Sequence, residues 1–490
     1  MKKIWKTILC GALTLTTLLS LTACTKETVI NAYDIAVKNG FVGTEQEWLQ
    51  SLHGADGEDG KDLKIEDIYA WAVEEQKFTG SYQDFLKMLG LEVNEDNNTE
   101  TIAKNITSTV EICCGFTRTV TETVGWGQTK STTYASASAG SGVIYDINRN
   151  AGTATIITNY HVIYSNSMTI LKNGQKQTVS GVDQTNGISD CVYVYPYGEL
   201  NAFSSGDTNN DSVLDGERGD KNHGIPARVI GGAMDYDIAI LETSVNTEYF
   251  GADGMANKAE LGDSNTATVG EKVFAVGNAN GMGISVTSGA LSVESEYIQM
   301  GKTDGSNTAV RYRVMRTDAP INHGNSGGGL YNAQGELIGI TNAKNVEDET
   351  DNMGYALPIT QVKYLVENML YNVKAGLGGY VSRAMLGITT VINSSSAKIV
   401  NGKLTIVEEC VVSTAPEAGT ASYNKLFYGD ILKSVTIKGI NYPLTRNFYL
   451  PELLLTVRNG ETITLHIVGN DQQAKDVAIT FATNHFVKYA

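Results

Sequence analysis

Short apolar runs, separated by Gly, Asn and Ser, recur through the middle of the chain. Their β-branched and aromatic residues, with turn-forming residues between them, are typical of strands. The runs are GSGVIYDI, TATIITNYHVI, SMTILKNG, DIAILET, EKVFAVGN, ELIGITNA and NMGYALPI. Many short strands with turn signals between them favour an all-β sandwich or barrel. We therefore expect this part of the chain to be mainly β.

Helical patterns flank these runs. Residues 360–373, TQVKYLVENMLYNV, have the 3.6-residue periodicity of an amphipathic helix, and KAGLGG after them predicts a hinge. Residues 33–90 hold a repeat, in which YDIAVKNGFVGTEQEWLQSLHG is echoed by YAWAVEEQKFTGSYQDFLKMLG. Each copy predicts a short helix, a Gly turn and a second helix, with Thr44 and Ser81 as N-caps. The repeats could dock a partner or serve as a passive stalk, and the sequence leaves both open.

Length and charge limit the range of functions. A chain of 490 residues is too long for one ordinary core, so two or three domains are expected. Hydrophobic residues make up 42% and charged residues 19%, which is a globular composition. The net charge of −17 disfavours nucleic-acid binding, because phosphate requires a basic surface.

The N-terminus has the order of a secretory signal. Lys2, Lys3 and Lys6 precede the apolar stretch ILCGALTLTTLLSL, which is short for a spanning helix. It ends in LTAC, which resembles a bacterial lipobox and predicts cleavage before Cys24 and lipidation of its thiol. We therefore expect a signal peptide at 1–23 and a lipoprotein held by its lipid on the extracytoplasmic side of the bacterial cell membrane. A plain signal peptide or an uncleaved anchor is the alternative.

Four cysteines remain outside the leader: Cys113, Cys114, Cys191 and Cys410. They form no C-x-x-C pair, so a zinc site is not expected. In an exported protein Cys113 or Cys114 could pair with Cys191, and buried free thiols are equally consistent with the sequence. We expect no cofactor.

Three residue types needed for nucleophilic catalysis occur in a suggestive order. Among the histidines, only His161 is expected to end a strongly apolar strand, where a rigid scaffold can hold a general base. Asp237 directly precedes the apolar run IAILE, where a carboxylate can accept from an imidazole N–H. Ser326 lies in GNSGG, whose small residues allow a sharp turn and let the N–H groups of Gly324 and Ser326 converge on an oxyanion. Each signal alone is weak, but together they predict a Ser–His–Asp triad.

The blocks around these residues resemble the HtrA (Deg) family of serine proteases, which have a chymotrypsin-like double β-barrel followed by a PDZ domain. GSGVIYD and TNYHVI are similar to the family's histidine region, and DYDIAIL to its aspartate region, with Asp237 rather than Asp235 in the triad position. VGEKVFAVGNANGMGISVTSG and RTDAPINHGNSGGGLYNAQGELIGI are similar to the stretches before and around the nucleophile, and MGYALPI to the strand beside the specificity pocket. The resemblance covers about residues 101–490.

The nucleophile loop departs from the family at two positions. His323 and Gly329 stand where the family usually has Pro. Losing Pro frees the backbone, so we expect an oxyanion loop, formed by Gly324, Asn325 and Ser326, that is more mobile at rest and assembles on substrate. His323 is expected near the mouth of the site as a neighbour that could touch substrate, because His161 already fills the role of base.

A long polar insertion, at about 175–224, also departs from the family. Within it, acidic and amide residues match the first, third, fifth and ninth positions of a calcium loop. These candidates are Asp207, Asn209, Asp211 and Asp215. Ser212 and Arg218 stand where such a loop has Gly and Glu, so a solvated Asn/Asp loop is favoured over a metal site.

The C-terminal region resembles a PDZ domain. RAMLGITT is similar to its carboxylate-binding loop, with the N–H groups of Leu386, Gly387 and Ile388 available to a peptide C-terminus. LFYGDILKSVTIKGI resembles its Gly-Asp core strand, and LPELLLTV its groove helix, so a peptide would add as a strand between the helix and the strand after Gly387. A domain that only packs on the protease is the alternative.

The resemblance predicts the domain organisation and the function. The expected parts are a signal peptide (1–23), a helical repeat and linker region (24–97), a trypsin-like protease domain (98–374) and a PDZ domain (380–490). The expected activity is that of an extracytoplasmic serine endopeptidase acting on misfolded or exported proteins, with a homotrimeric core. Ile321 and residues 342–344 form the expected pocket wall, which lacks an obvious buried charge and so favours small or aliphatic side chains. Two alternatives are a narrow-specificity glutamyl-type endopeptidase and a surface-anchored peptide-binding or chaperone module.

Overall fold

The described part of the computed structural model runs from Asn98 to Ala490, except for residues 173, 199–223, 246, 251–254, 307, 343–352 and 401–402. Before Asn98 it includes only residues 37, 42–44, 69 and 85. The chain divides into two units, Met1–Asn97 and Asn98–Ala490. The predicted lipidation site Cys24, nearly all of the repeats and the calcium candidates therefore lie outside the described residues. Of the helices that are described, none is long and apolar enough to cross a membrane.

Six strands close a first β-barrel in the order β1-β2-β3-β8-β7-β6. Alternate residues of β1 point into it: Val110, Ile112 and Cys114 are fully buried, as the two-residue period of a strand requires. The strands are β1 (Thr109–Val124), β2 (Gln128–Asn148), β3 (Thr153–Thr158), β6 (Cys191–Pro196), β7 (Ile225–Ala233) and β8 (Ile238–Ser244).

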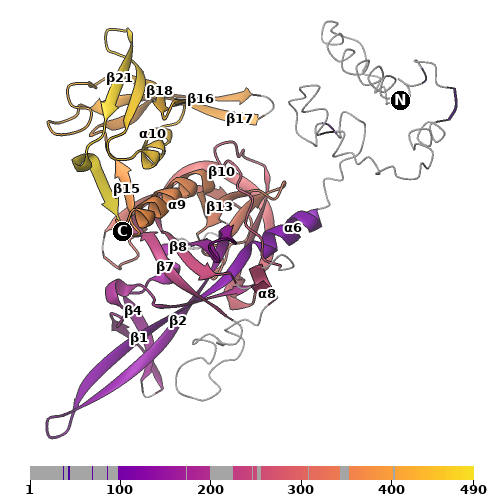
Figure 1. Cartoon of the computed structure of the whole chain (residues 1–490), viewed down its shortest axis with the longest axis vertical. Helices are drawn as coiled ribbons and strands as arrows, with labels where there is room; N and C mark the ends of the chain where they lie inside the picture. Colours follow the sequence, from indigo (N-terminus) through magenta and orange to yellow (C-terminus); the bar gives the residue numbers. More distant parts are fainter. Residues whose placement is uncertain are drawn as a thin grey trace. The chain divides into compact units, whose positions relative to one another are not determined.

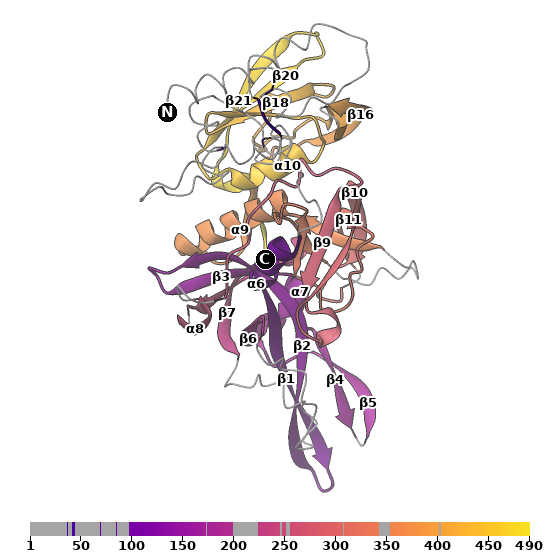
Figure 2. The same cartoon turned by 90° about the vertical axis from the view of Figure 1, so that its right-hand side faces the viewer.

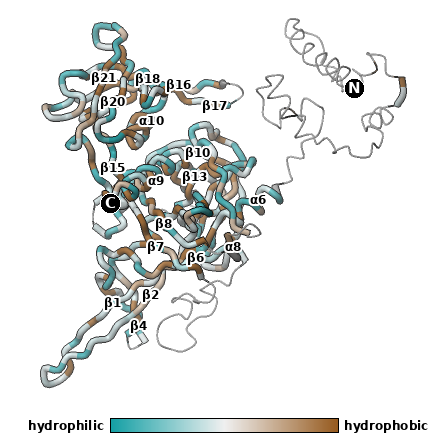
Figure 3. Tube along the Cα trace, in the orientation of Figure 1, coloured by the Kyte–Doolittle hydropathy of each residue, from teal (hydrophilic) through white to brown (hydrophobic). Residues whose placement is uncertain are grey.

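A second six-stranded barrel closes in the order β10-β11-β14-β13-β12-β9. Its strands are β9 (Lys272–Gly277), β10 (Ser285–Gly301), β11 (Ala309–Thr317), β12 (Gly329–Asn332), β13 (Leu337–Thr341) and β14 (Gly354–Pro358). Figure 3 shows hydrophobic positions gathered along central strands such as β8 and β13. The two barrels confirm the predicted mainly β, chymotrypsin-like fold.

Helices connect and cover the barrels (Figure 1). α6 (Asn98–Thr107) precedes β1, the single turns α7 (Tyr160–Ile163) and α8 (Thr247–Phe250) follow β3 and β8, and α9 (Ile359–Lys374) follows β14. The periodicity of residues 360–373 is confirmed by α9, which buries Val362, Leu365, Val366 and Met369 in the main core cluster. The expectation that TATIITNYHVI is a single strand is wrong, because β3 ends at Thr158 and the chain turns into α7 after Asn159.

Two hairpins project from the first barrel (Figure 2). One is the outer half of β1 and β2, which pair continuously out to Val124 and Gln128. The other joins β4 (Ser167–Lys172) to β5 (Gln175–Ser180). The stretch expected as an insertion at about 175–224 is too wide, because β6 lies inside it and pairs with both β1 and β7 to close the barrel.

The C-terminal region forms a separate sheet with its own core. Its order is β16-β17-β18-β20-β21, with β19 beside β18, while β15 pairs with β22. The helix α10 (Tyr449–Leu453) continues into the 3₁₀ turn Leu454–Thr456 and buries Leu450, Leu453 and Leu454 in this core. The strands are β15 (Val381–Ala384), β16 (Thr389–Val400), β17 (Lys403–Thr414), β18 (Ile431–Ile437), β19 (Ile440–Pro443), β20 (Thr462–Val468), β21 (Ala474–Thr480) and β22 (Phe486–Tyr489).

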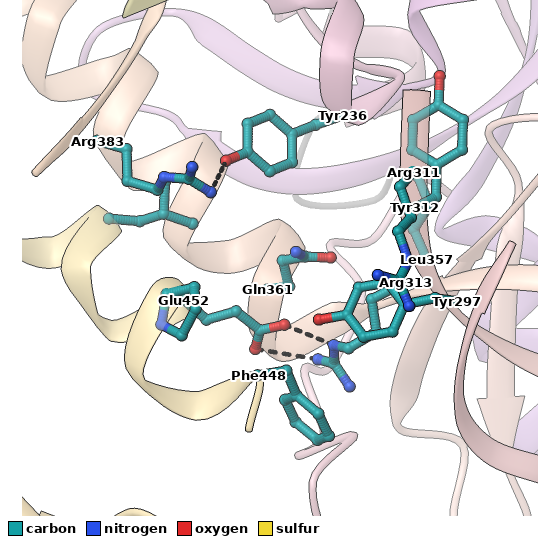
Figure 4. A pocket seen from close by; sticks show the side chains of 12 residues that line it. Tyr236, Tyr297, Arg311, Tyr312, Arg313, Leu357, Gln361, Arg383, Phe448 and Glu452 are labelled. Carbon is teal, nitrogen blue, oxygen red and sulfur yellow. Dashed lines mark hydrogen bonds and ion pairs between the residues drawn. The ribbon is translucent and has the colours of Figure 1, made fainter. Parts of the chain in front are cut away.

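A buried ion pair joins this C-terminal region to the second barrel (Figure 4). Arg313 of β11 donates from Nε and Nη2 to the two carboxylate oxygens of Glu452 in α10, at 2.5 and 3.0 Å. The Arg313 guanidinium also lies over the Phe448 ring, 4.0 Å from its centroid. Both contacts border a small cavity of about 100 Å³.

Candidate active site

The structure brings His161 and Asp237 together at the edge of the first barrel. His161 Nδ1 lies 2.8 Å from Asp237 Oδ2, and the His161 backbone N–H donates to Asp237 Oδ1 at 3.0 Å. The Asp237 side chain is fully buried, whereas that of His161 keeps 21% exposure. An ionised carboxylate only accepts hydrogen bonds, so the imidazole proton stays on Nδ1 and leaves Nε2 as a base that faces outward.

Two asparagines that the sequence did not single out as partners of Asp237 hold it in place. Asn342, just after β13, donates from Nδ2 to Asp237 Oδ2 at 2.9 Å, and Asn159 donates from Nδ2 to the Asp237 carbonyl at 2.9 Å. Asp237 itself has left-handed backbone angles, φ 52° and ψ 40°, at the end of a 3₁₀ turn. These contacts orient the carboxylate toward α7. Asn159 could have been suspected from its place two residues before His161.

Asn342 was expected in the wall of the specificity pocket, but its side chain turns to Asp237 instead. Its backbone N–H donates to Tyr355 O of β14 at 2.8 Å, which fixes the direction of the side chain. Ile321 does lie against β14, since a Cβ on Gly354 would approach its Cδ1 to 2.7 Å. Residues 343–344 lie outside the described part of the chain.

Ser326 lies in the loop that leads into β12, beside the segment that carries His161. Its carbonyl accepts from the Ser141 N–H at 2.8 Å, and the residue is 5% exposed. The next residue, Gly327, has φ +85°, and a Cβ there would lie 2.4 Å from Thr158 Oγ1 and 3.1 Å from Asn159 N. Only glycine permits this close approach. Ser326, from the second barrel, is therefore held directly against the chain that enters α7.

The turn before Ser326 presents one backbone donor. Asn325 N–H donates to Asn322 O at 3.1 Å, which closes a turn with Gly324 at φ +90°. The His323 carbonyl accepts from Asn280 N–H at 2.6 Å. In a trans peptide the C=O and N–H point in opposite directions, so the Gly324 N–H points away from Asn280.

Gly324 N–H has no acceptor among the described residues and is available to an oxyanion. Asn325, the middle residue of the predicted oxyanion loop, uses its own N–H to close this turn. A side chain at Gly324 would place its Cβ 2.1 Å from Asn278 O, so the position requires glycine. His323 has an exposed side chain, in agreement with its expected place as a neighbour.

The two departures from the family pattern have structural counterparts. The His323 carbonyl is fixed by Asn280, which lies in the loop after β9. Gly329 begins β12, and a Cβ there would approach the Tyr331 ring to 2.3 Å. The buried Tyr331 side chain therefore excludes a larger residue at position 329.

The segment predicted to bind a peptide C-terminus has free backbone donors. Leu386, Gly387 and Ile388 donate to no acceptor within the described chain. Gly387 has φ +83°, and a Cβ there would lie 2.4 Å from Thr420 Cβ. The Leu386 carbonyl accepts from Ser422 Oγ at 2.8 Å, which leaves the N–H side of the loop open.

The cysteines Cys113, Cys114, Cys191 and Cys410 are free thiols. Burial is the largest cause that raises the pKa of Cys114, so this thiol stays protonated. Within the described ranges, no group of His, Cys, Asp or Glu side chains could hold a metal ion.

Residues 140–340 match the family model of the trypsin-like peptidase domain. The chain is 36% identical over 167 residues to the "Serine protease Do-like HtrB" of Bacillus subtilis (strain 168), a match that covers 34% of this chain and 33% of that protein. It is 29% identical over 264 residues to the "Serine protease Do-like HtrA" of Lactococcus lactis subsp. cremoris (strain MG1363), covering 52% of this chain and 49% of that one.

A third relative is the "Periplasmic serine endoprotease DegP" of Escherichia coli (strain K12), 32% identical over 249 residues, with 50% of this chain and 47% of that one covered. The matches thus span half or less of the relatives' own length. His161, Asp237 and Ser326 lie within the matched stretch, which is similar to trypsin-like peptidase domains and to HtrA-type serine proteases.

Proposed function

We propose that this chain is an extracytoplasmic serine endopeptidase of the HtrA type. The observation that carries the proposal is the 2.8 Å contact between His161 Nδ1 and Asp237 Oδ2, made beside the loop that holds Ser326. Fully buried Asp237 and outward-facing His161 Nε2 are the orienting acceptor and the general base that a serine nucleophile requires.

The proposed mechanism is acyl transfer. Ser326 Oγ attacks the peptide carbonyl while His161 Nε2 takes its proton and later gives it to the leaving amine. Asp237 keeps the imidazole proton on Nδ1 and stabilises the imidazolium that forms. The oxyanion is held by the N–H groups of Gly324 and Ser326, and the Asn280 contact pre-orients the first of these.

The finer features of the proposal are the domain boundaries and the partners. We infer that residues 380–490 act as a PDZ domain, supported by the free donors of residues 386–388 and by α10 beside the sheet. Unfolded or exported polypeptides are the proposed substrates, and peptide C-termini the proposed ligands of the C-terminal sheet. Lipidation at Cys24 and a homotrimeric core belong to the same proposal.

A fluorophosphonate probe tests the proposed activity, since only an assembled Ser–His–Asp site reacts with it. We expect the parent protein to be labelled and to cleave casein, and Ser326→Ala to do neither. Ser131→Ala, which alters an exposed serine on the outer part of β2, is the matched control and should behave as the parent. Equal labelling of Ser326→Ala would overturn the assignment. A parent that binds unfolded protein but neither reacts nor cleaves would support a chaperone module instead.

A further inference from the structure

A buried carboxyl group outside the triad lies between the two barrels. Glu111 is on β1, and its neighbours Val110 and Ile112 point into the first barrel, so Glu111 points out of it. It is nevertheless only 3% exposed. In the sheet it lies directly opposite Ser141 of β2 and Tyr195 of β6. Residues opposite one another in an antiparallel pair share a face, so Glu111 and Ser141 lie together on the interbarrel side.

The group that faces Glu111 from the second barrel is Asn278. Its side chain favours the ionised carboxyl, and burial opposes this more strongly, so that the pKa of Glu111 is raised from 4.5 to about 7. Glu111 Oε1 and Asn278 Nδ2 are both buried and have no hydrogen-bond partner among the described residues. The Asn278 amide therefore acts on the Glu111 carboxyl, and neither of these two buried atoms has another partner among the described residues, which is rare in native cores.

Asn278 and the loop that follows it make several of the hydrogen bonds that fix the oxyanion loop. Its backbone N–H donates to Ser141 Oγ at 2.8 Å, and that hydroxyl donates to Gly324 O at 2.7 Å. Its Oδ1 accepts from Gly283 N–H at 2.8 Å, which closes the loop after β9. Inside that loop, Asn280 N–H holds the His323 carbonyl. Contacts from the Asn278 segment therefore reach the carbonyls on both sides of Gly324, those of His323 and of Gly324 itself.

We propose that Glu111 is a positioning residue for the oxyanion hole, acting through Asn278 on the loop that orients the His323–Gly324 peptide. This inference rests on the proposed protease function, and it makes Glu111 one of the residues that determine kcat. The ionised carboxylate attracts Asn278 Nδ2 and holds the loop after β9 against β1. The protonated carboxyl attracts it less, so the Gly324 N–H is less firmly directed at the oxyanion.

The surroundings make this effect separable from other ionisations. The titratable side chains that share the face of Glu111 are Tyr195 on β6 and Cys113 on β1. Burial and Asn278 are the causes of the Glu111 shift, and no charged side chain of the described chain contributes to it. Any pH effect that the parent and a Glu111 variant share cancels in the ratio of their rates.

The test compares the parent protein with Glu111→Leu and Glu111→Gln over pH 5.5–8.5, with kcat and KM measured on a chromogenic peptide. Loss of a whole oxyanion donor costs about 10²–10³-fold in kcat, so a loosened donor should cost about tenfold. At pH 8.5 we expect Glu111→Leu to lose about tenfold in kcat with KM unchanged. Glu111→Gln, whose amide oxygen can still accept from Asn278, should be closer to the parent. At pH 5.5, where the parent carboxyl is protonated and keeps only a neutral acceptor oxygen, the ratio of parent to Glu111→Leu should fall to that of Glu111→Gln to Glu111→Leu.

A peptide boronate separates positioning from a merely structural role. Its tetrahedral adduct uses the oxyanion hole, whereas a product peptide does not, so Glu111→Leu should weaken boronate binding about tenfold and leave product binding unchanged. Cys113→Ala, on the same face of β1, is the matched control. A ratio that stays constant with pH, or equal losses for boronate and product, would overturn the inference. A parent that fails to react with the fluorophosphonate would instead overturn the proposed function.

Discussion

Replacing Arg313 with methionine should weaken the attachment of the C-terminal sheet to the second barrel. Arg313 and Glu452 form a two-pronged ion pair at 2.5 and 3.0 Å, and their side chains are 1% and 5% exposed. Phe448 covers the guanidinium from one side. Solvent is thus excluded from both charges, and each depends on the other for its compensation.

The size of the effect follows from this burial. Removing one member of a buried pair leaves an uncompensated charge and costs about 3–5 kcal/mol of unfolding free energy. Replacing both members by apolar residues of similar volume is often neutral. Arg313→Met and Glu452→Leu should therefore each destabilise strongly, and the double variant should recover most of the loss. The coupling between the two positions should be about 3 kcal/mol.

Guanidinium unfolding followed by far-UV circular dichroism, on the parent, both single variants and the double variant, measures this coupling. Arg311→Met is the matched control, because Arg311 is exposed and stacks on Tyr297 without a carboxylate partner among the described residues. It should change the free energy of unfolding by about 0.5 kcal/mol or less. If the double variant loses the sum of the two single losses, the pair is not coupled and the reasoning fails.

Three further predictions concern the site and the C-terminal loop. Asn342→Ala removes a hydrogen bond to buried Asp237 and should lower kcat/KM about tenfold in peptide hydrolysis; an unchanged value would exclude an orienting role. Burial raises the pKa of Glu111 from 4.5 to about 7, so the folded state binds the proton more tightly than the unfolded state. The free energy of unfolding of the parent should therefore fall by about 3 kcal/mol as the pH rises from 4.5 past 7. Denaturant titrations at pH 4.5 and 8 should show no such fall for Glu111→Leu. If the difference in unfolding free energy between parent and variant is the same at both pH values, the prediction is refuted. Gly387→Ala places a Cβ against Thr420 at a residue with positive φ. It should weaken the binding of a fluorescent peptide with a free apolar C-terminus at least about tenfold, measured by anisotropy. Unchanged binding would show that this loop is not part of the proposed groove.

The sequence predicted the β-strands and the order of the triad because these depend on local patterns. Apolar alternation gave the barrel strands, and the 3.6-residue period gave α9. The break at Asn159 was not predicted, because β3 ends where the Asn159 side chain donates to the Asp237 carbonyl, just before the neighbouring strand β8. No local pattern records such a partner.

Other features that the sequence did not predict depend on contacts between the barrels. Glu111 has the pattern of a solvent-facing residue on a half-buried strand, and it is buried only because the second barrel packs on that face. The engagement of the Asn325 N–H in a turn, and the turn of Asn342 toward Asp237, follow from the register of β12, β13 and β14. Sequence spacing alone cannot supply that register.

These contacts cross between the barrels in both directions. Asn342, from the second barrel, orients Asp237 of the first, and Ser141, from the first barrel, binds Gly324 of the second. Each half of the proposed machinery is therefore held by a polar side chain of the other half. A small relative shift of the barrels would disturb the base and the oxyanion donor together, because each also depends on a contact from the other barrel. This is why a carboxyl at the interbarrel contact, remote from the substrate, can still determine the rate.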